Sequence, residues 1–114
     1  MSTIKLRTKR QDNKTLVRLM IDHPMETGRR RDEVTGKTIP AHYITELKLE
    51  HNGKLRVRGM LSTAISRNPY FSFRLDDVKP NDIIRVTWID NQGGTDSQEI
   101  RVTGAAIGDQ DANG

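Results

Sequence analysis

Several features that often direct the interpretation of a sequence are missing from this chain. Its 114 residues include no cysteine, which excludes disulfide bonds, thiolate nucleophiles and thiolate metal sites. No run approaches the roughly 18 apolar residues of a membrane-spanning helix, and the first seven residues lack the apolar centre of a signal peptide. We therefore expect the chain to stay in the cytoplasm, unless a signal has been removed or a partner carries the chain out.

Aromatic residues are also scarce. The chain has one Trp, two Tyr and two Phe, the apolar fraction is 33%, and the mean hydropathy is −0.71. A chain of this length fits one domain with one core, but this composition predicts a thin core. Two explanations stay open. Either a partner covers part of the apolar surface and completes the core, or the protein is a small domain with a polar surface.

The formal net charge is +4, from 19 Lys and Arg against 15 Asp and Glu. Such a surplus attracts anions, which include nucleic acid, acidic proteins and small oxyanions. The run Arg29-Arg30-Arg31 is either a solvated loop or an anion-attracting patch, because guanidinium groups suit carboxylates and sulfate-like groups. No named nucleic-acid-binding motif is present, so we do not expect nucleic acid as a partner.

Period-two alternation of apolar and polar residues dominates the chain and indicates β-strands. We expect strands near residues 4–7, 15–22, 43–50, 54–58, 70–75, 84–88 and 98–102. Asn52-Gly53 is a strong signal for a two-residue hairpin. On the third strand, one face is predicted to hold the alternating residues Tyr43, Thr45, Leu47 and Leu49. No convincing amphipathic helix is visible.

This pattern predicts an all-β fold, an antiparallel β-sandwich of about seven strands. Immunoglobulin-like topology is the leading interpretation. Residues 1–103 are expected to form a single domain, and residues 104–114, rich in Gly, Ala and Asp, a mobile tail. The predicted core includes alternating apolar residues of these strands: Leu16, Leu47, Leu49, Val57, Phe71, Phe73, Val86 and Trp88.

No arrangement typical of catalysis or metal binding stands out. The chain has three histidines, His23, His42 and His51, without a ligand-like spacing. His42 and His51 have opposite parity, so on one continuous strand they would point to opposite faces. The adjacent carboxylates Asp32-Glu33 and Asp76-Asp77 point apart in extended chain. We therefore predict no enzymatic activity, no catalytic residue, no cofactor and no bound metal.

Two parts of the sequence are candidates for binding a partner. Tyr70 lies opposite in parity to Phe71 and Phe73, and a half-buried tyrosine suits an interface. The loop that follows the second predicted strand begins at His23, where Pro24 restricts the backbone. The predicted partner-binding residues are His23, Pro24, Met25, Glu26 and Tyr70. Simpler explanations, a capped loop and an edge tyrosine packed on its own loop, stay open.

Four segments, taken in this order and with these gaps, resemble the SoxZ family. They are Thr15–Gly28 (TLVRLMIDHPMETG), Ile39–Ile44 (IPAHYI), Asn68–Arg74 (NPYFSFR) and Val86–Gly93 (VTWIDNQG). The resemblance implies an immunoglobulin-like sandwich without catalytic residues. It also implies a heterodimer with SoxY, whose cysteine on a glycine-rich C-terminal arm carries sulfur intermediates during thiosulfate oxidation.

The same resemblance implies transient docking of other Sox enzymes and a periplasmic location, reached by export together with a partner that bears the signal. The Arg29–Arg31 run and the tail correspond to nothing in the resemblance. The alternative is a stand-alone immunoglobulin-like module that binds an unrelated protein.

Overall fold

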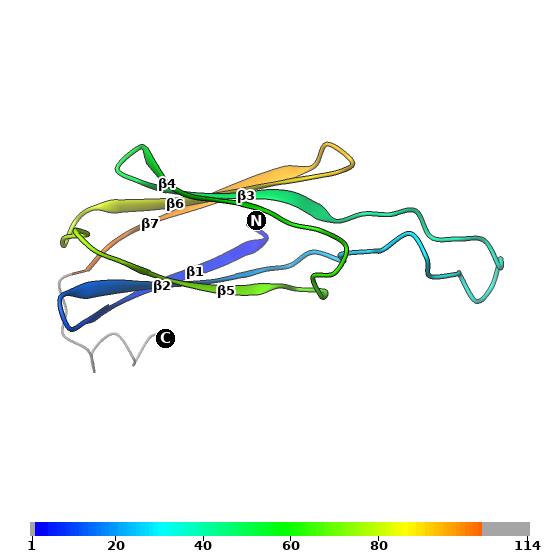
Figure 1. Cartoon of the computed structure of the whole chain (residues 1–114), viewed down its shortest axis with the longest axis horizontal. Helices are drawn as coiled ribbons and strands as arrows, with labels where there is room; N and C mark the ends of the chain where they lie inside the picture. Colours follow the sequence, from blue (N-terminus) through cyan, green and yellow to red (C-terminus); the bar gives the residue numbers. More distant parts are fainter. Residues whose placement is uncertain (1, 104–114) are drawn as a thin grey trace.

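The structure, a computed structural model of the chain, describes residues 2–103. The tail of residues 104–114, for which the sequence predicts mobility, lies outside the described residues. Two antiparallel sheets pack face to face, and the described residues form no helix (Figure 1). The predicted all-β sandwich is therefore confirmed. None of the described segments is a helix long and apolar enough to cross a membrane.

Seven strands make up the two sheets. They are β1 (Ile4–Gln11), β2 (Lys14–Ile21), β3 (Ile44–His51), β4 (Lys54–Met60), β5 (Tyr70–Leu75), β6 (Ile83–Asp90) and β7 (Thr95–Arg101). The smaller sheet has the order β1-β2-β5, and the larger sheet has the order β4-β3-β6-β7. Hairpins join β1 to β2, β3 to β4 and β6 to β7, while the other connections cross between the sheets. This order is immunoglobulin-like.

Two of the hairpins turn at consecutive residues with positive φ. Asn52 (51°) and Gly53 (82°) form the predicted turn between β3 and β4. Asp12 (50°) and Asn13 (67°) form the same kind of turn between β1 and β2, which was not predicted from the sequence. Asn and Asp tolerate this left-handed region better than other non-glycine residues do. Both turns therefore fix the register of their strand pairs.

The core lies between the sheets, where every second residue of each strand points inward. Four of the predicted core residues are buried there: Leu47, Leu49, Val86 and Trp88. Three others are partly buried and pack against this cluster: Val57, Phe71 and Phe73. Leu16 is buried as predicted, although it lies outside the main core cluster. Val17 and Leu19 point inward on β2, so Leu16 belongs to the outer face.

A β-bulge near the start of β3 changes which residues face the core. The register with β6 shifts between Ile44 and Glu46. Ile44 is fully buried, while Thr45 is only half-buried and donates its hydroxyl hydrogen to the carbonyl of Ile89. The prediction that Thr45 shares the core face with Leu47 is therefore wrong, because a bulge adds one residue and reverses the alternation.

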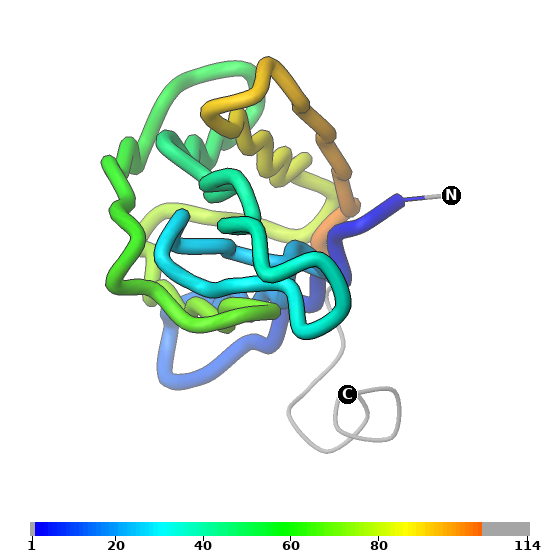
Figure 2. Tube along the Cα trace, turned by 90° about the vertical axis from the view of Figure 1, so that its right-hand side faces the viewer, coloured from blue at the N-terminus to red at the C-terminus, as the bar shows by residue number. Residues whose placement is uncertain are grey.

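The connection from β2 to β3, residues 22–43, projects beyond the end of the sandwich as two extended legs (Figure 1). We call it the arm. Viewed end-on, the arm lies in front of the strands (Figure 2). Isolated bridges join the legs at Glu26 with His42 and at Arg31 with Thr38. Gly28, at φ 86°, makes close approach possible, because a Cβ there would lie 3.1 Å from Cβ of Ala41.

The arginine run lies on the arm, and two of its members bond within the arm. The guanidinium group of Arg30 donates three hydrogen bonds of 3.0–3.2 Å to the carboxylate of Glu26. Arg31 donates to the carbonyl of Gly36 at 3.1 Å. Part of the donor capacity of the run is therefore used within the arm, so the side chains of Arg30 and Arg31 are only partly available to an anion.

Candidate functional site

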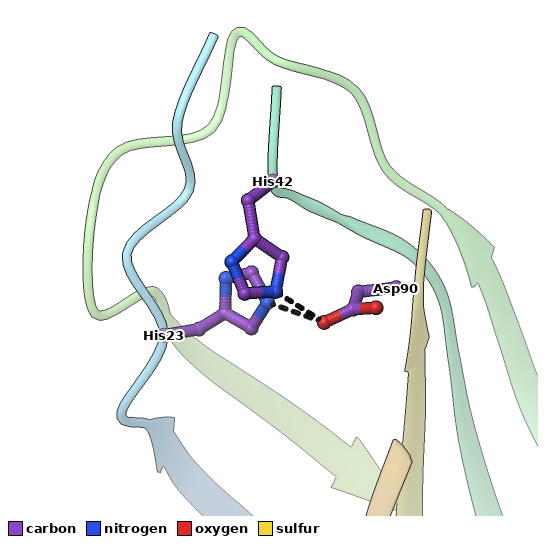
Figure 3. A group of neighbouring side chains, drawn as sticks. All are labelled: His23, His42 and Asp90. Carbon is purple, nitrogen blue, oxygen red and sulfur yellow. Dashed lines mark hydrogen bonds and ion pairs between the residues drawn. The ribbon is translucent and has the colours of Figure 1, made fainter. Parts of the chain in front are cut away.

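Three polar side chains, two of them buried and one half-buried, meet at the base of the arm. His23 comes from the leg that leaves β2, His42 from the leg that returns to β3, and Asp90 from the end of β6 (Figure 3). Nε2 of His23 lies 3.0 Å from Oδ2 of Asp90, and Nε2 of His42 lies 2.7 Å from the same oxygen. We call these three residues the clasp, because one carboxylate ties both legs of the arm to the larger sheet.

Asp90 is almost inaccessible to solvent, yet both oxygens of its carboxylate accept hydrogen bonds from other groups of the protein. Its other oxygen, Oδ1, accepts hydrogen bonds from the backbone N–H groups of Gln92 (3.0 Å) and Gly94 (2.7 Å). Burial raises the pKa of Asp90, but the hydrogen bonds from His23, Gly94, His42 and Gln92 outweigh it and hold the pKa below its ordinary value. The ionised carboxylate is therefore the stable form at the clasp.

The hydrogen bonds around His23 define the state of its ring. The backbone N–H of Met25 donates to Nδ1 of His23 at 3.0 Å. Nδ1 therefore bears no proton, and the ring proton is on Nε2, where it is donated to Asp90. The ring is 2% exposed and meets the indole of Trp88 edge to face, with 5.1 Å between ring centroids. His23 is thus held from three sides.

Met25 accounts for the path of the leaving leg. Its φ of 48° is unusual for a residue with a side chain, and such a conformation costs on the order of 1 kcal/mol. The side chain is buried in the core, and its Sδ accepts a hydrogen bond from the backbone N–H of Ile44 at 3.3 Å. This packing and the bond to His23 compensate for the strained backbone.

A second network borders the clasp. The indole N–H of Trp88 donates to Oγ1 of Thr3 at 3.0 Å, and both the hydroxyl and the backbone N–H of Thr3 donate to Oδ2 of Asp96. The backbone hydrogen bond from Thr3 is the main reason why the pKa of Asp96 is lowered. A shallow open hollow lies between the two networks, with His42 and Pro24 on its rim.

The clasp has the residue types of a metal site, but the nitrogen and oxygen atoms that would bind the metal are already hydrogen-bonded. Its three ligand atoms lie within 4.8 Å of one another, the one such cluster within residues 2–103. A metal at Nε2 of His23 would move the ring proton to Nδ1, which faces the N–H of Met25. Both oxygens of Asp90 are already bonded. The geometry therefore favours a hydrogen-bonded clasp, and the absence of metal stays a prediction.

The same geometry offers no nucleophile to a histidine base. The nearest hydroxyls, those of Thr3 and Thr95, donate elsewhere, Thr3 to Asp96 and Thr95 to the carbonyl of Trp88. No hydroxyl among the described residues is hydrogen-bonded to His42, as a base–nucleophile pair requires. What the arrangement does is mechanical: it fixes the base of a projecting arm.

The structure places the predicted partner-binding residues in different environments. His23 and Met25 are buried, so they support the surface rather than form it. Pro24 is exposed, Glu26 is half-buried against Arg30, and Tyr70 is 55% exposed. Partner binding by these residues stays a prediction.

Two of the three histidines, His23 and His42, converge, which the spacing of the histidines in the sequence did not predict. His42 precedes β3 and its bulge, so the parity argument, which assumed one continuous strand, does not apply to it. His51 is separate and bonds Oδ2 of Asp82 at 2.7 Å. The sequence pattern also did not indicate a role for Asp90, which appeared only within the segment Val86–Gly93.

One signal could have revealed the clasp. The segments on which the family resemblance rests meet at this end of the sandwich: His23, His42 and Asp90 each lie in a different one. The fourth segment contributes Asn68, which brackets the backbone of His23 with two hydrogen bonds of 3.0–3.1 Å. Their convergence in space explains why segments distant in sequence form one recognisable pattern.

Fold and site together define an immunoglobulin-like sandwich with a clasped arm and no catalytic constellation among its described residues. The sequence matches the family model described as sulphur oxidation protein SoxZ over residues 4–101. The chain therefore belongs to the SoxZ family and has a role in sulfur oxidation. No curated protein matches the chain.

Proposed function

We propose that this protein is the thiol-free subunit of a two-subunit carrier in thiosulfate oxidation. It pairs with a SoxY-like protein, whose cysteine bears the sulfur intermediates, and helps to present them to other Sox enzymes. The observation that carries the proposal is the family match over residues 4–101 in a sequence without cysteine. A covalently carried sulfur group needs a thiol, so the thiol belongs to another chain.

In this role the protein is not an enzyme. The clasp supports this interpretation, because its carboxylate is saturated with hydrogen bonds and its buried histidine is already a donor. The protein instead stabilises its partner and supplies surface.

The arm and Tyr70 are the proposed pairing surface. Val34, near the tip of the arm, is 93% exposed, and Tyr70 begins β5 at the same end of the sandwich, two residues after Asn68. A large exposed apolar side chain on a projecting loop suits a partner that covers it. The clasp then has a clear purpose, since a fixed base lowers the entropy lost when the arm is ordered by binding.

Co-expression with a SoxY-like protein, followed by purification through a tag on that protein, tests the proposal. We expect a stable heterodimer, and Tyr70→Asp or Val34→Asp should weaken it by about 1–2 kcal/mol if the residue is buried on pairing. Leu55→Asp is the matched control, since Leu55 is 49% exposed on β4, away from the arm. Failure of the wild-type chain to bind any SoxY-like protein would contradict the pairing.

We also propose that the pair is exported to the periplasm by a signal on the partner. Expression of the chain with and without the SoxY-like protein, followed by cell fractionation, tests this. The chain should reach the periplasm only when the partner and its signal are present.

A further inference from the structure

The outer face of the smaller sheet gathers positive charge in a regular array. Cross-strand register places its side chains in three rows: Lys5–Met20–Tyr70, Arg7–Arg18–Ser72 and Lys9–Leu16–Arg74. We call these nine positions the basic face. Five of them are Lys or Arg, and none is Asp or Glu. With strands about 4.8 Å apart and residues about 3.4 Å apart along them, the face measures roughly 10 by 14 Å.

Four of the five cations of the basic face have no hydrogen-bond or ion-pair partner in the part of the chain that the structure describes. The side chains of Lys5, Arg7, Arg18 and Arg74 make no hydrogen bond or ion pair with another residue in this part. Lys14, which follows the third row on β2, is by contrast ion-paired with Asp76. The charge is therefore available to an anionic partner.

The register itself makes this array unfavourable for the isolated fold. Arg7 and Arg18 stand directly opposite each other on β1 and β2, and like charges in this position destabilise a sheet. On the outer face of the larger sheet Lys48 also stands opposite Arg58, but there Arg58 is ion-paired with Glu46 and Arg85 with Glu99. A carboxylate from another molecule, placed between Arg7 and Arg18, would turn this repulsion into attraction.

One end of the basic face adds the apolar side chain of Met20 and borders the proposed pairing surface at Tyr70. Met20 is 41% exposed and Tyr70 is 55% exposed, and they are cross-strand neighbours in the first row. Together with Lys5, Arg7 and Arg18 they line a shallow hollow. Tyrosine, methionine and arginine are the residues enriched in protein interfaces. Single-stranded nucleic-acid sites stack successive bases on several aromatic side chains, whereas Tyr70 is the one aromatic residue among the nine positions of this face.

We infer that the basic face is a docking surface for an acidic surface on another protein, bound transiently and in a salt-dependent way. Permanent interfaces have few charges at their centre, while charged faces mainly set the association rate and the choice of partner. The charged middle row, Arg7–Arg18–Ser72, therefore suits a transient contact, which is different from the permanent pairing proposed for the arm.

The test uses the full chain, labelled with ¹⁵N and titrated with poly-L-glutamate as a model acidic polypeptide. We expect amide shift changes concentrated on β1, β2 and β5. Binding should vanish near 1 M salt, where the screening length is roughly 3 Å. Arg7→Glu with Arg18→Glu should weaken binding about tenfold or more, and urea unfolding shows whether this variant is folded.

The matched control is Lys54→Glu with Lys79→Glu, which makes the same change in net charge at exposed positions outside the basic face. Its binding should fall much less. Equal losses in both variants would show that only net charge matters and would overturn the inference. Tighter, face-dependent binding of a DNA duplex or of phosphatidylserine vesicles in the same assay would overturn it in favour of another class of partner.

Discussion

The charged groups of the clasp and of the basic face differ in burial and in how far other residues of the chain pair with them. At the clasp, Asp90 is buried and every oxygen lone pair is matched by a donor of the same chain. On the basic face, arginines are exposed and stand next to one another without a carboxylate. The first arrangement stabilises the fold and leaves little for a ligand. The second weakens the fold slightly and leaves its charges for a partner.

This contrast separates stability from binding. Substitutions at the clasp should lower the free energy of unfolding, because they strand buried donors. Substitutions on the basic face should leave stability nearly unchanged or raise it, while they change association. The predictions below run from the largest expected change in stability to the smallest.

Asp90→Ala should have the largest effect. It removes the acceptor of four hydrogen bonds and leaves the N–H of His23 buried without a partner. An unsatisfied buried donor costs about 1–3 kcal/mol, so we expect a loss of about 3 kcal/mol in urea unfolding. Asp22→Ala is the control, because Asp22 is exposed at the same end and its side chain bonds no described residue. A similar loss in both variants would contradict the role of the clasp.

The fold could be predicted from the sequence because strand alternation depends on neighbouring residues. Leu47, Val86 and Trp88 are buried where the pattern places them. Deviations have local causes, as with the bulge that turns Ile44 rather than Thr45 toward the core. A bulge leaves no clear mark in a single sequence.

The clasp could not be predicted in the same way. It joins residues 23, 42 and 90, which only the path of the arm brings together. Spacing rules detect ligands that share one helix or one strand, and these residues share neither. The N–H groups of the turn after β6 donate hydrogen bonds to the carboxylate of Asp90. These bonds depend on where β6 ends, which a single sequence does not show.

Gly94→Ala should have the next largest effect. A Cβ at this position would lie 2.8 Å from Oδ2 and 3.0 Å from Oδ1 of Asp90, so the carboxylate must move away from its donors. Overpacking of this kind costs about 1–3 kcal/mol. Gly59→Ala is the control, since its Cβ would meet nothing within 4 Å. Urea unfolding of both variants measures the difference, and equal stability would show that the turn at Asp90 is more yielding than the structure indicates.

Acid should weaken the fold through its bonded carboxylates. Hydrogen bonds from His51, the backbone of Lys79 and Asn52 lower the pKa of Asp82 from 3.8 to about 2. A carboxyl whose pKa is lower in the folded state stabilises the fold fully above its unfolded pKa. This stability is therefore lost as the pH falls from about 4 to about 2.

The urea midpoint, measured from pH 6 downward, tests this dependence. We expect a decline that begins near the ordinary carboxyl pKa of about 4, and a shallower decline in Asp82→Asn. An unchanged slope in that variant would show that other carboxyls, such as Asp90 or Asp96, dominate the acid response.

The smallest effect on stability is expected on the basic face, and its sign is the sharpest test of the contrast. Arg18→Glu replaces a like-charge pair with Arg7 by an opposite-charge pair at the same register position. Cross-strand pairs of this kind are worth about 0.2–1 kcal/mol, so the variant should be slightly more stable than the wild type. Its binding to an acidic polypeptide should nevertheless be weaker. Arg85→Glu provides the opposite case, because Arg85 stands between Glu50 and Glu99 in the register and is ion-paired with Glu99, so its replacement should lower stability. A less stable Arg18→Glu would mean that the arginines of the basic face serve the fold itself, and the proposed division between the two regions would then be wrong.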